Sequence, residues 1–449
     1  MSSGRVTKKP KPKTSTSPFI KVSLSVIVLF IFTLTIVKIS EFFTTTDHPK
    51  IPQLKIALTD IPIEQIDQAD KELRYPGNSA SITADGHTDI FEDVEIKKRG
   101  NATEQYAKKP YQIKFNHKTP LLNLSANRKW VLLANYSDHS FLRTDIAFHL
   151  QQLLGSNYPL NGQFVELYID DNYRGLYYLT DKVEVGKNRV NLRDQDGIIM
   201  ELDNLYGEKD GCNYDLDYNC LVVKDFVNPD REETAVDSFM DSLNKLEQSL
   251  IVKDYNSIND LINIDSFAQY YLISEFTVNP DAYTTSFFMY KDGGKIYAGA
   301  GWDFDAALGN RLWNTNGIDP NVLHSPTESD VLQRYLKNAE SSDSYANSIS
   351  TIMYSLLSIS EFQARIKEIY QQTISGHNEE LLDYIKSQAA YIKDAAERDQ
   401  KRWKLQADFD EEIDYLIDWV AKRYSHFEEI YNTDSSTTNL GPTPESLQP

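Results

Sequence analysis

The spacing of hydrophobic residues changes near residue 230 of this 449-residue chain. Between 52 and 230, apolar and polar residues alternate in short runs, which is typical of strands with one buried face. From 231 to 433, apolar residues recur about every 3.6 positions, which is typical of amphipathic helices. The pattern predicts an α+β fold with a β-rich N-terminal lobe at 52–230 and a helical C-terminal lobe at 231–433.

The predicted strands are short, and polar turns separate them. In the N-terminal lobe, one helix is predicted at 141–150, and the strands cover 94–99, 111–115, 130–134, 164–169 and 176–185. In the C-terminal lobe, the predicted helices cover 236–250, 264–276, 345–369, 381–396 and 411–431.

An apolar run precedes the two lobes. Residues 22–37 are uncharged and mainly apolar, so we predict a transmembrane helix at 19–43. A cleaved signal peptide is the alternative, although no small-residue cleavage site follows the run. Residues 1–18 are basic and rich in Pro, Ser and Thr, which is typical of a disordered tail, and 434–449 also has a tail composition. The basic residues before the run predict a single-pass membrane protein with a cytoplasmic N-terminus and an extracytoplasmic main domain.

The net charge excludes one class of partner, and the two cysteines predict a covalent link within the chain. The net charge is −20, so we expect no nucleic-acid partner, because contacts with a phosphate backbone need a basic face. The chain has two cysteines, Cys212 and Cys220, and an even pair in an oxidising compartment usually bonds. We therefore predict a disulfide, since two thiols alone make only half of a zinc site.

Three aspartates lie in two predicted loops on either side of a hairpin. Asp281 follows Pro280, which cannot continue a helix, so it is predicted on a loop. A hairpin is predicted at 287–298, and Asp303 and Asp305 follow it, with both carboxylates on one side if strand geometry continues. Protein kinases use this order, in which the loop aspartate accepts the substrate hydroxyl's proton and the later aspartate binds magnesium. Ordinary turn and capping chemistry is the alternative.

Several sequence motifs occur together in this part of the chain. Taken in order, they resemble the CotH kinases, a family that is named for a bacterial spore-coat protein and that includes fungal surface proteins. The motifs are RGN at 99–101, KPYQIKF at 109–115, WVLLAN at 130–135, Asp138, LR at 142–143, GLYYL at 175–179 ahead of Lys182, NPD at 279–281, WDFD at 302–305 and GN at 309–310.

The resemblance implies an atypical protein-kinase fold of two lobes with ATP and Mg²⁺ bound between them. On this basis Asp281 is the catalytic aspartate and Asp303 is a metal ligand. Ser286 stands where spore-coat members of the family have a metal-binding asparagine, and a hydroxyl is a poorer magnesium ligand than an amide carbonyl. We expect Asp305 to compensate as a further metal ligand.

The resemblance also places residues of the N-terminal lobe near the phosphates of ATP. Arg99, Asn101 and Lys114 are the expected phosphate-side residues, and Arg143 is expected to face the same site. Lys109 and Lys129 are alternatives to Lys114 as the lysine that anchors ATP, and we favour Lys114 because it lies in a strand near a turn. Solvated surface charge and a simple tight turn are the other interpretations of these residues.

Two functions remain open. The first is a membrane-anchored, ATP-dependent kinase that phosphorylates Ser or Thr in envelope or secreted proteins. The second is a non-catalytic structural or adhesion protein of the cell envelope, because an outward-facing domain meets little ATP. Retention of Asp281 and Asp303 favours the kinase, whereas Ser286 favours the second function. Histidine zinc spacings, a nucleophile elbow and a Walker loop are absent from the sequence.

Overall fold

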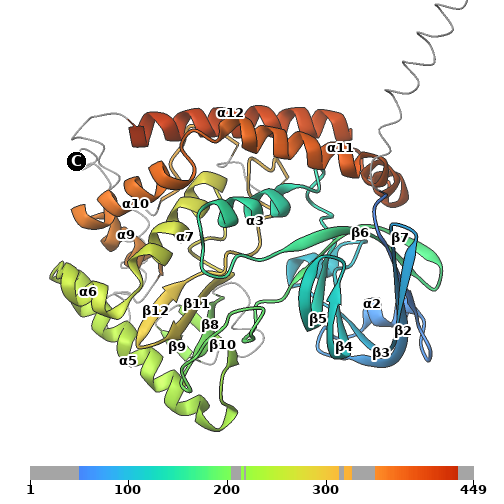
Figure 1. The fold of residues 1–449 in the computed structure, drawn as a ribbon, viewed down its shortest axis with the longest axis horizontal. Coiled ribbons are helices and arrows are strands. Elements are labelled where there is room, and N and C mark those ends of the chain that lie inside the picture. Colours follow the sequence, from blue (N-terminus) through green and yellow to red (C-terminus); the bar gives the residue numbers. More distant parts are fainter. Residues whose placement is uncertain (1–49, 204–213, 217–218, 313–317, 326–348, 433–449) are drawn as a thin grey trace, which may run out of the picture. The chain divides into compact units, whose positions relative to one another are not determined.

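The computed structural model describes residues 50–203, 214–216, 219–312, 318–325 and 349–432 (Figure 1). Within these ranges the chain has a β-rich N-terminal region and a helical C-terminal region, which confirms the predicted α+β class. No helix in the described ranges is long and apolar enough to cross a membrane. Cys220 is disulfide-bonded. The segments that lie outside the described residues include the predicted membrane helix at 19–43, the predicted tails at 1–18 and 434–449, and Cys212.

A closed barrel forms the first part of the described chain (Figure 1). Its strands follow the order β1-β2-β3-β4-β5-β7-β6, and a parallel pairing of β1 with β6 closes it. Along β4, Tyr111, Ile113 and Phe115 alternate with more polar residues and belong to the barrel core. The strands are β1 (Gln53–Ala57), β2 (Tyr75–Ala84), β3 (His87–Lys98), β4 (Tyr111–Leu121), β5 (Leu124–Leu133), β6 (Gly162–Ile169) and β7 (Asn172–Asp181).

A second sheet has the strand order β12-β11-β8-β10-β9. Strands β11 and β12 form the predicted hairpin, and β8 pairs antiparallel with β11. This sheet therefore combines strands from both sides of the lobe boundary that we predicted at residue 230. The strands are β8 (Ile198–Leu202), β9 (Tyr214–Leu216), β10 (Asn219–Phe226), β11 (Phe287–Asp292) and β12 (Lys295–Ala298).

Helices make up most of the chain after residue 231. The predicted single helix at 345–369 is wrong in its described part, because the backbone is extended at Ile359 and separates two helices there. The helices are α2 (Ile63–Gln68), α3 (Arg143–Leu153), α5 (Glu232–Ile251), α6 (Tyr255–Leu261), α7 (Ile264–Thr277), α9 (Ile349–Leu357), α10 (Ser360–Thr373), α11 (Asn378–Trp403) and α12 (Phe409–Asn432), with single 3₁₀ turns at Ala102–Gln105 and Pro229–Arg231.

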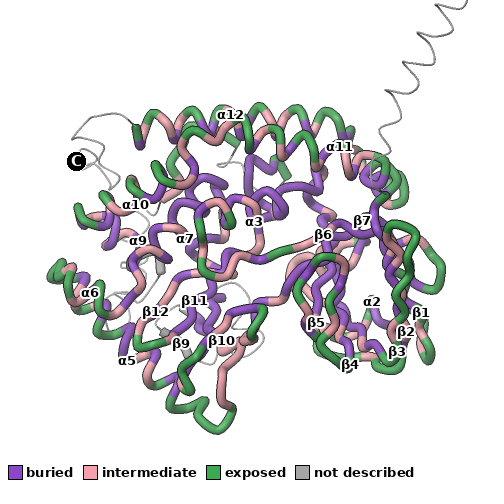
Figure 2. The backbone as a smooth tube through the Cα atoms, viewed as in Figure 1, coloured by how far each residue is buried: buried purple, intermediate pink, exposed green. Residues whose placement is uncertain are grey.

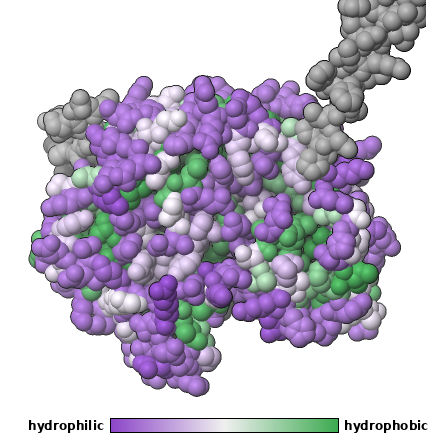
Figure 3. Space-filling view, in the orientation of Figure 1, coloured by the Kyte–Doolittle hydropathy of each residue, from purple (hydrophilic) through white to green (hydrophobic). Residues whose placement is uncertain are grey.

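The larger hydrophobic core lies among the helices and the second sheet. Helix α7 is buried along almost its whole length, whereas α11 and α12 lie side by side and keep exposed outer faces (Figure 2). The molecular face drawn in Figure 3 is mainly hydrophilic, with smaller apolar areas between the polar side chains. Helix α7 is thus a fixed central element, and the loop that carries Asp281 begins at its C-terminal end.

The barrel contacts helix α11 through β7. Gly175 makes this close approach possible, because a Cβ atom at this position would lie 2.1 Å from Oδ2 of Asp399. Its φ of +118° is also a conformation that side chains rarely allow. Beside this contact, Arg398 of α11 forms an ion pair with Glu166 of β6 at 2.9 Å.

Candidate active site

The loop after α7 presents the carboxylate of Asp281. The helix ends where Val278 adopts a left-handed conformation with φ of 49°. The loop is then fixed by its backbone, since the carbonyl of Asp281 accepts hydrogen bonds from the N–H groups of Thr284 and Thr285, both at 3.0 Å. The Asp281 carboxylate itself has no hydrogen-bond or ion-pair partner in the described part of the chain. Burial and the nearby charge of Asp303 raise the pKa of Asp281 to about 7.

Asp303 and Asp305 lie on the loop after β12. The condition that strand geometry continues to these residues is not met, because β12 ends at Ala298 and Asp303 has φ of 65°. The two carboxylates nevertheless interact with each other. Phe304, the residue between them, is only 1% exposed and therefore anchors this loop in the core.

Hydroxyl groups from two other segments bond these carboxylates. Ser286 Oγ donates to Asp303 Oδ2 at 3.1 Å, and Ser137 Oγ donates to Asp305 Oδ2 at 2.9 Å. Burial and the charge of Asp303 raise the pKa of Asp305 to about 8, and burial also raises the pKa of Asp303. The site therefore holds more negative charge than its surroundings stabilise.

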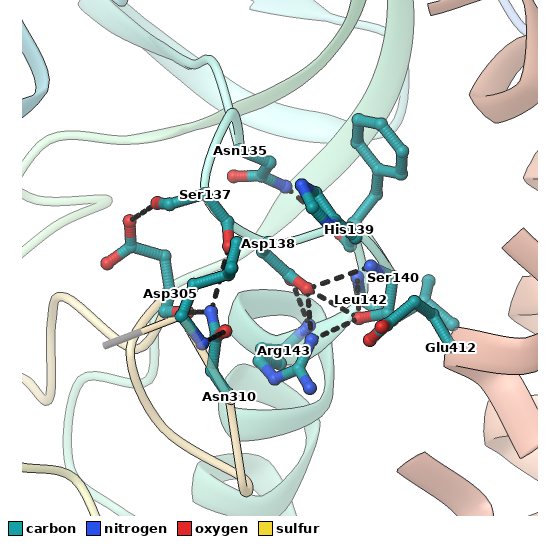
Figure 4. Close-up of polar contacts among 12 residues, drawn as sticks. Asn135, Ser137, Asp138, His139, Ser140, Leu142, Arg143, Asp305, Asn310 and Glu412 are labelled. Carbon is teal, nitrogen blue, oxygen red and sulfur yellow. Dashed lines mark hydrogen bonds and ion pairs between the residues drawn. The ribbon is translucent and has the colours of Figure 1, made fainter. Parts of the chain in front are cut away.

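Arg143 forms hydrogen bonds that hold the loop carrying Asp303 and Asp305 and the segment around Asp138 in place (Figure 4). Its Nε donates to the carbonyl of Ala307 at 3.1 Å, and its Nη1 donates to Asp138 Oδ1 at 2.5 Å. Asn310 adds a second brace, because its Nδ2 donates to the carbonyls of Ser137 and Asp305 at 3.0 and 2.6 Å. Arg143 is 1% exposed, so the structure gives it a positioning role in place of the phosphate contact that we expected.

Arg99 brings a positive charge from the barrel toward the aspartates. It follows β3, and its guanidinium lies 5.2 Å from the ring centre of Trp302, the residue before Asp303. Burial lowers the pKa of Arg99, and the charges of Asp303 and Glu201 oppose that effect. Arg99 is thus close enough to Asp303 to interact with its charge, and its expected contact with phosphate stays a prediction.

Asn101 and Lys114 lie in other surroundings. The Oδ1 of Asn101 accepts a hydrogen bond from Lys71 Nζ at 2.8 Å. Lys114 pairs with Glu95 across β3 and β4 at 2.6 Å. In the described ranges, no hydrogen bond or ion pair links either side chain to the aspartates, so the structure does not support either as a phosphate ligand. Of the alternatives, Lys109 donates to the Glu104 carbonyl at 2.6 Å.

Sequence reasoning missed four residues around the site, namely Ser137, Glu201, Asp203 and Thr285. Thr285 Oγ1 donates to Asp203 Oδ1 at 2.9 Å, which connects the Asp281 loop to the end of β8. Glu201 and Asp203 occur two residues apart at the end of a strand, and this period-2 spacing of two acids was a usable signal. Ser137 carries no such signal, because its role depends on a contact with the distant Asp305.

The donor set fits a magnesium ion that is shared with phosphate groups. In the described part of the chain, no cluster of three or more His, Cys, Asp or Glu residues has the geometry to hold a metal by itself. Magnesium usually takes one or two carboxylates, and phosphate and water oxygens complete its six ligands. Asp303 and Asp305 supply two neighbouring carboxylates whose pKa values are raised, mainly by burial. These two residues therefore suit magnesium bound together with a nucleotide.

The fold and these two acidic loops define an α+β protein with the catalytic layout of protein kinases. The family model described as CotH kinase protein matches residues 96–427, a range that includes all three aspartates. The chain therefore belongs to the CotH kinase family, and the resemblance inferred from its motifs is confirmed. No curated protein matches the chain.

Proposed function

We propose that this chain is an ATP-dependent protein kinase that transfers the γ-phosphate to Ser or Thr hydroxyls of envelope or secreted proteins. A single-pass helix at 19–43 would anchor it, with a cytoplasmic N-terminus and the kinase domain outside the cytoplasm. The observation that carries the proposal is the grouping of Asp281, Asp303 and Asp305, in which burial and the charge of Asp303 raise the pKa values of Asp281 and Asp305.

Asp281 has the properties of the residue that orients the acceptor hydroxyl. Its carboxylate lacks a partner in the described part of the chain, so it is available to accept a hydrogen bond from a substrate. A pKa of about 7 is suitable for a group that accepts a proton at neutral pH. The backbone bonds of its loop and the buried helix α7 hold this carboxylate in place.

Asp303 and Asp305 have the properties of metal ligands. When bound, Mg²⁺ would neutralise charge on the transferring phosphate. The two hydroxyls of Ser286 and Ser137 orient the carboxylates, and Arg143 holds the backbone of the loop. Asp305 would then compensate for Ser286, which stands in place of the metal-binding asparagine.

A non-catalytic envelope protein is the second candidate. Ser286 favours it, because the side chain donates to Asp303 and offers a hydroxyl where an amide carbonyl would bind metal better. Phosphate transfer distinguishes the two candidates, since a structural or adhesion protein has no need of it.

The test is transfer of phosphate by the purified full-length chain. The chain is incubated with Mg²⁺, ATP radiolabelled on the γ-phosphate and a mixture of secreted proteins, and label on Ser and Thr is counted. We compare the wild type, Asp281→Asn and the control Asp241→Asn, which changes an exposed aspartate on α5. We expect transfer by the wild type and the control, and a loss of about a hundredfold or more in Asp281→Asn. Equal labelling by Asp281→Asn, or none by the wild type, would contradict the proposal.

A further inference from the structure

Lys182 occupies the position directly after β7, at the edge of the barrel. Strands β5 and β7 are antiparallel, with Trp130 opposite Asp181, so the next positions outward are those of Lys129 and Lys182. Lys129 is paired, because its Nζ lies 2.9 Å from Glu184 Oε2. Lys182 is half-buried, and its ammonium has no hydrogen bond or ion pair within the described ranges. Such a cation is unusual, since buried charges are normally paired.

The acids near Lys182 are already engaged elsewhere. Glu184 and Asp225 attract its charge, whereas Lys129 and Arg99 repel it. Glu184 is held by Lys129, and the two carboxylate oxygens of Asp225 accept the N–H groups of Val185 and Phe226 at 2.9 and 3.0 Å. Burial consequently lowers the pKa of Lys182, as expected for a cation whose charge is not fully compensated.

Arg99 lies close enough to interact electrostatically with both Lys182 and Asp303. Its guanidinium lies over Trp302. The guanidinium makes no hydrogen bond or ion pair in the described part of the chain, so its N–H donors are available. Two cations therefore lead from the barrel edge toward the acidic group. An anion that contacts Arg99 therefore lies close to Lys182 and to Asp303 as well.

We propose that Lys182, together with Arg99, binds the phosphate chain of the nucleotide. The inference rests on the proposed kinase function. It assigns the lysine that anchors ATP to Lys182 in place of Lys114, Lys109 or Lys129. A nucleoside triphosphate suits the site because its phosphates are extended and strongly anionic. The ammonium of Lys182 binds as a point charge, and the fork of Arg99 can take two oxygens at once.

The test compares Lys182→Met with the matched control Lys114→Met in the full-length chain. Lys114 is on the same barrel but is already paired with Glu95. Calorimetry gives the Kd for Mg·ATP, and competition gives the Kd for adenosine, which has no phosphates. We expect Lys182→Met to weaken Mg·ATP binding about ten- to a hundredfold and to leave adenosine binding unchanged. Lys114→Met should bind both ligands like the wild type.

Two further measurements make the result decisive. Thermal unfolding should show that Lys182→Met is at least as stable as the wild type, because the change removes an uncompensated cation. Lys182→Arg keeps the charge and should retain most of the Mg·ATP affinity. If Lys182→Met does not fold, Lys182→Gln takes its place and is compared with Lys182→Arg.

The outcomes separate this inference from the function on which it rests. If the wild type binds Mg·ATP and Lys182→Met or Lys182→Gln binds it equally well, the assignment of Lys182 is wrong and the kinase proposal stands. An equal loss for Mg·ATP and adenosine would also overturn the assignment, because the phosphates would not be involved. If the wild type binds no Mg·ATP, the proposed function and this inference fail together.

Discussion

Nζ of Lys108 lies 2.5 Å from Oδ2 of Asp399 in an ion pair that is fully buried. The same Lys108 donates to the carbonyl of Leu176 at 2.5 Å, and Asp399 accepts the N–H of Leu176 at 2.7 Å. The pair therefore ties together the segment before β4, strand β7 and helix α11. Burial lowers the pKa of Lys108 and raises the pKa of Asp399, and their mutual attraction opposes both effects.

Breaking this pair on one side should destabilise the protein strongly. Lys108→Met leaves the Asp399 charge buried and alone, so we expect the free energy of unfolding to fall by about 3–5 kcal/mol. The double variant Lys108→Met/Asp399→Asn removes both charges and keeps an acceptor for Leu176, so it should recover most of the loss. Urea unfolding measures each variant. Lys245→Met, which removes an exposed pair with Asp241, is the control and should change stability by less than about 1 kcal/mol. A single variant as stable as the wild type would contradict the account.

Arg423 should affect both stability and phosphate transfer. Its guanidinium pairs with Glu275 at 2.9 Å and donates to the carbonyls of Pro320 and Val322 at 2.9 and 2.7 Å, so it organises the end of α7 near the Asp281 loop. Lys cannot reproduce this fork. We expect Arg423→Lys to lower kcat for transfer more than it weakens Mg·ATP binding.

The neighbouring Lys422 provides the control for this comparison. It is exposed and pairs with Asp418 one turn away, so Lys422→Met should leave kcat and binding unchanged. Urea unfolding reports the stability of both variants. If Arg423→Lys shows wild-type kcat despite lower stability, the guanidinium serves folding and not the arrangement of the catalytic loop.

Asp145 should make stability depend on pH. Its carboxylate accepts hydrogen bonds from Tyr178 and Tyr384 at 2.8 and 2.9 Å, but burial raises its pKa from 3.8 to about 6. The folded state therefore binds this proton more tightly than the unfolded state. The protonated carboxyl contributes to the free energy of unfolding at low pH, and this contribution is lost as pH rises from about 4 through 6. We expect the loss to reach about 3 kcal/mol relative to Asp145→Asn, which has no such titration. Urea unfolding of both proteins from pH 4 to about 7 checks this, and parallel pH profiles would refute it.

Ser286→Asn should strengthen the metal site. Ser286 has φ of 54°, a left-handed conformation that Asn adopts more readily than Ser. An amide carbonyl is also a better magnesium ligand than a hydroxyl. We expect the Asn variant to need less Mg²⁺ for half-maximal ATP binding than the wild type. Ser286→Ala, which loses the hydrogen bond to Asp303, should need more. The reverse order would show that this position does not face the metal.

The sequence predicted the parts of the site that depend on local signals. Pro280 ended the helix and placed Asp281 on a loop, and the Gly293–Gly294 turn with its flanking aromatic residues placed the hairpin. The two acidic loops follow from these elements alone. Strand geometry did not extend to Asp303, because β12 ends at Ala298 and Asp303 has a left-handed backbone conformation. A period-2 argument cannot detect such a conformation at a residue other than glycine.

The supporting residues could not be predicted because their partners are far apart in the sequence. Ser137 and Asp305 are separated by 168 residues, and Arg143 and Ala307 by 164. The pairing of Lys114 with Glu95 could not be predicted for the same reason, since strand register decides that these two residues meet. Only the assembled barrel distinguishes a paired lysine from an unpaired one.

The central claim is that Asp303 holds magnesium against a bound nucleotide. Calorimetry of ATP binding to the full-length chain, with and without Mg²⁺, tests it most directly for the wild type, Asp303→Asn and the exposed-site control Asp241→Asn. We predict that Mg²⁺ strengthens ATP binding by the wild type and the control. In the presence of Mg²⁺, Asp303→Asn should bind ATP at least about tenfold more weakly than the wild type while it stays folded. Binding that is unaffected by Mg²⁺ in the wild type, or unchanged in Asp303→Asn, would contradict the account.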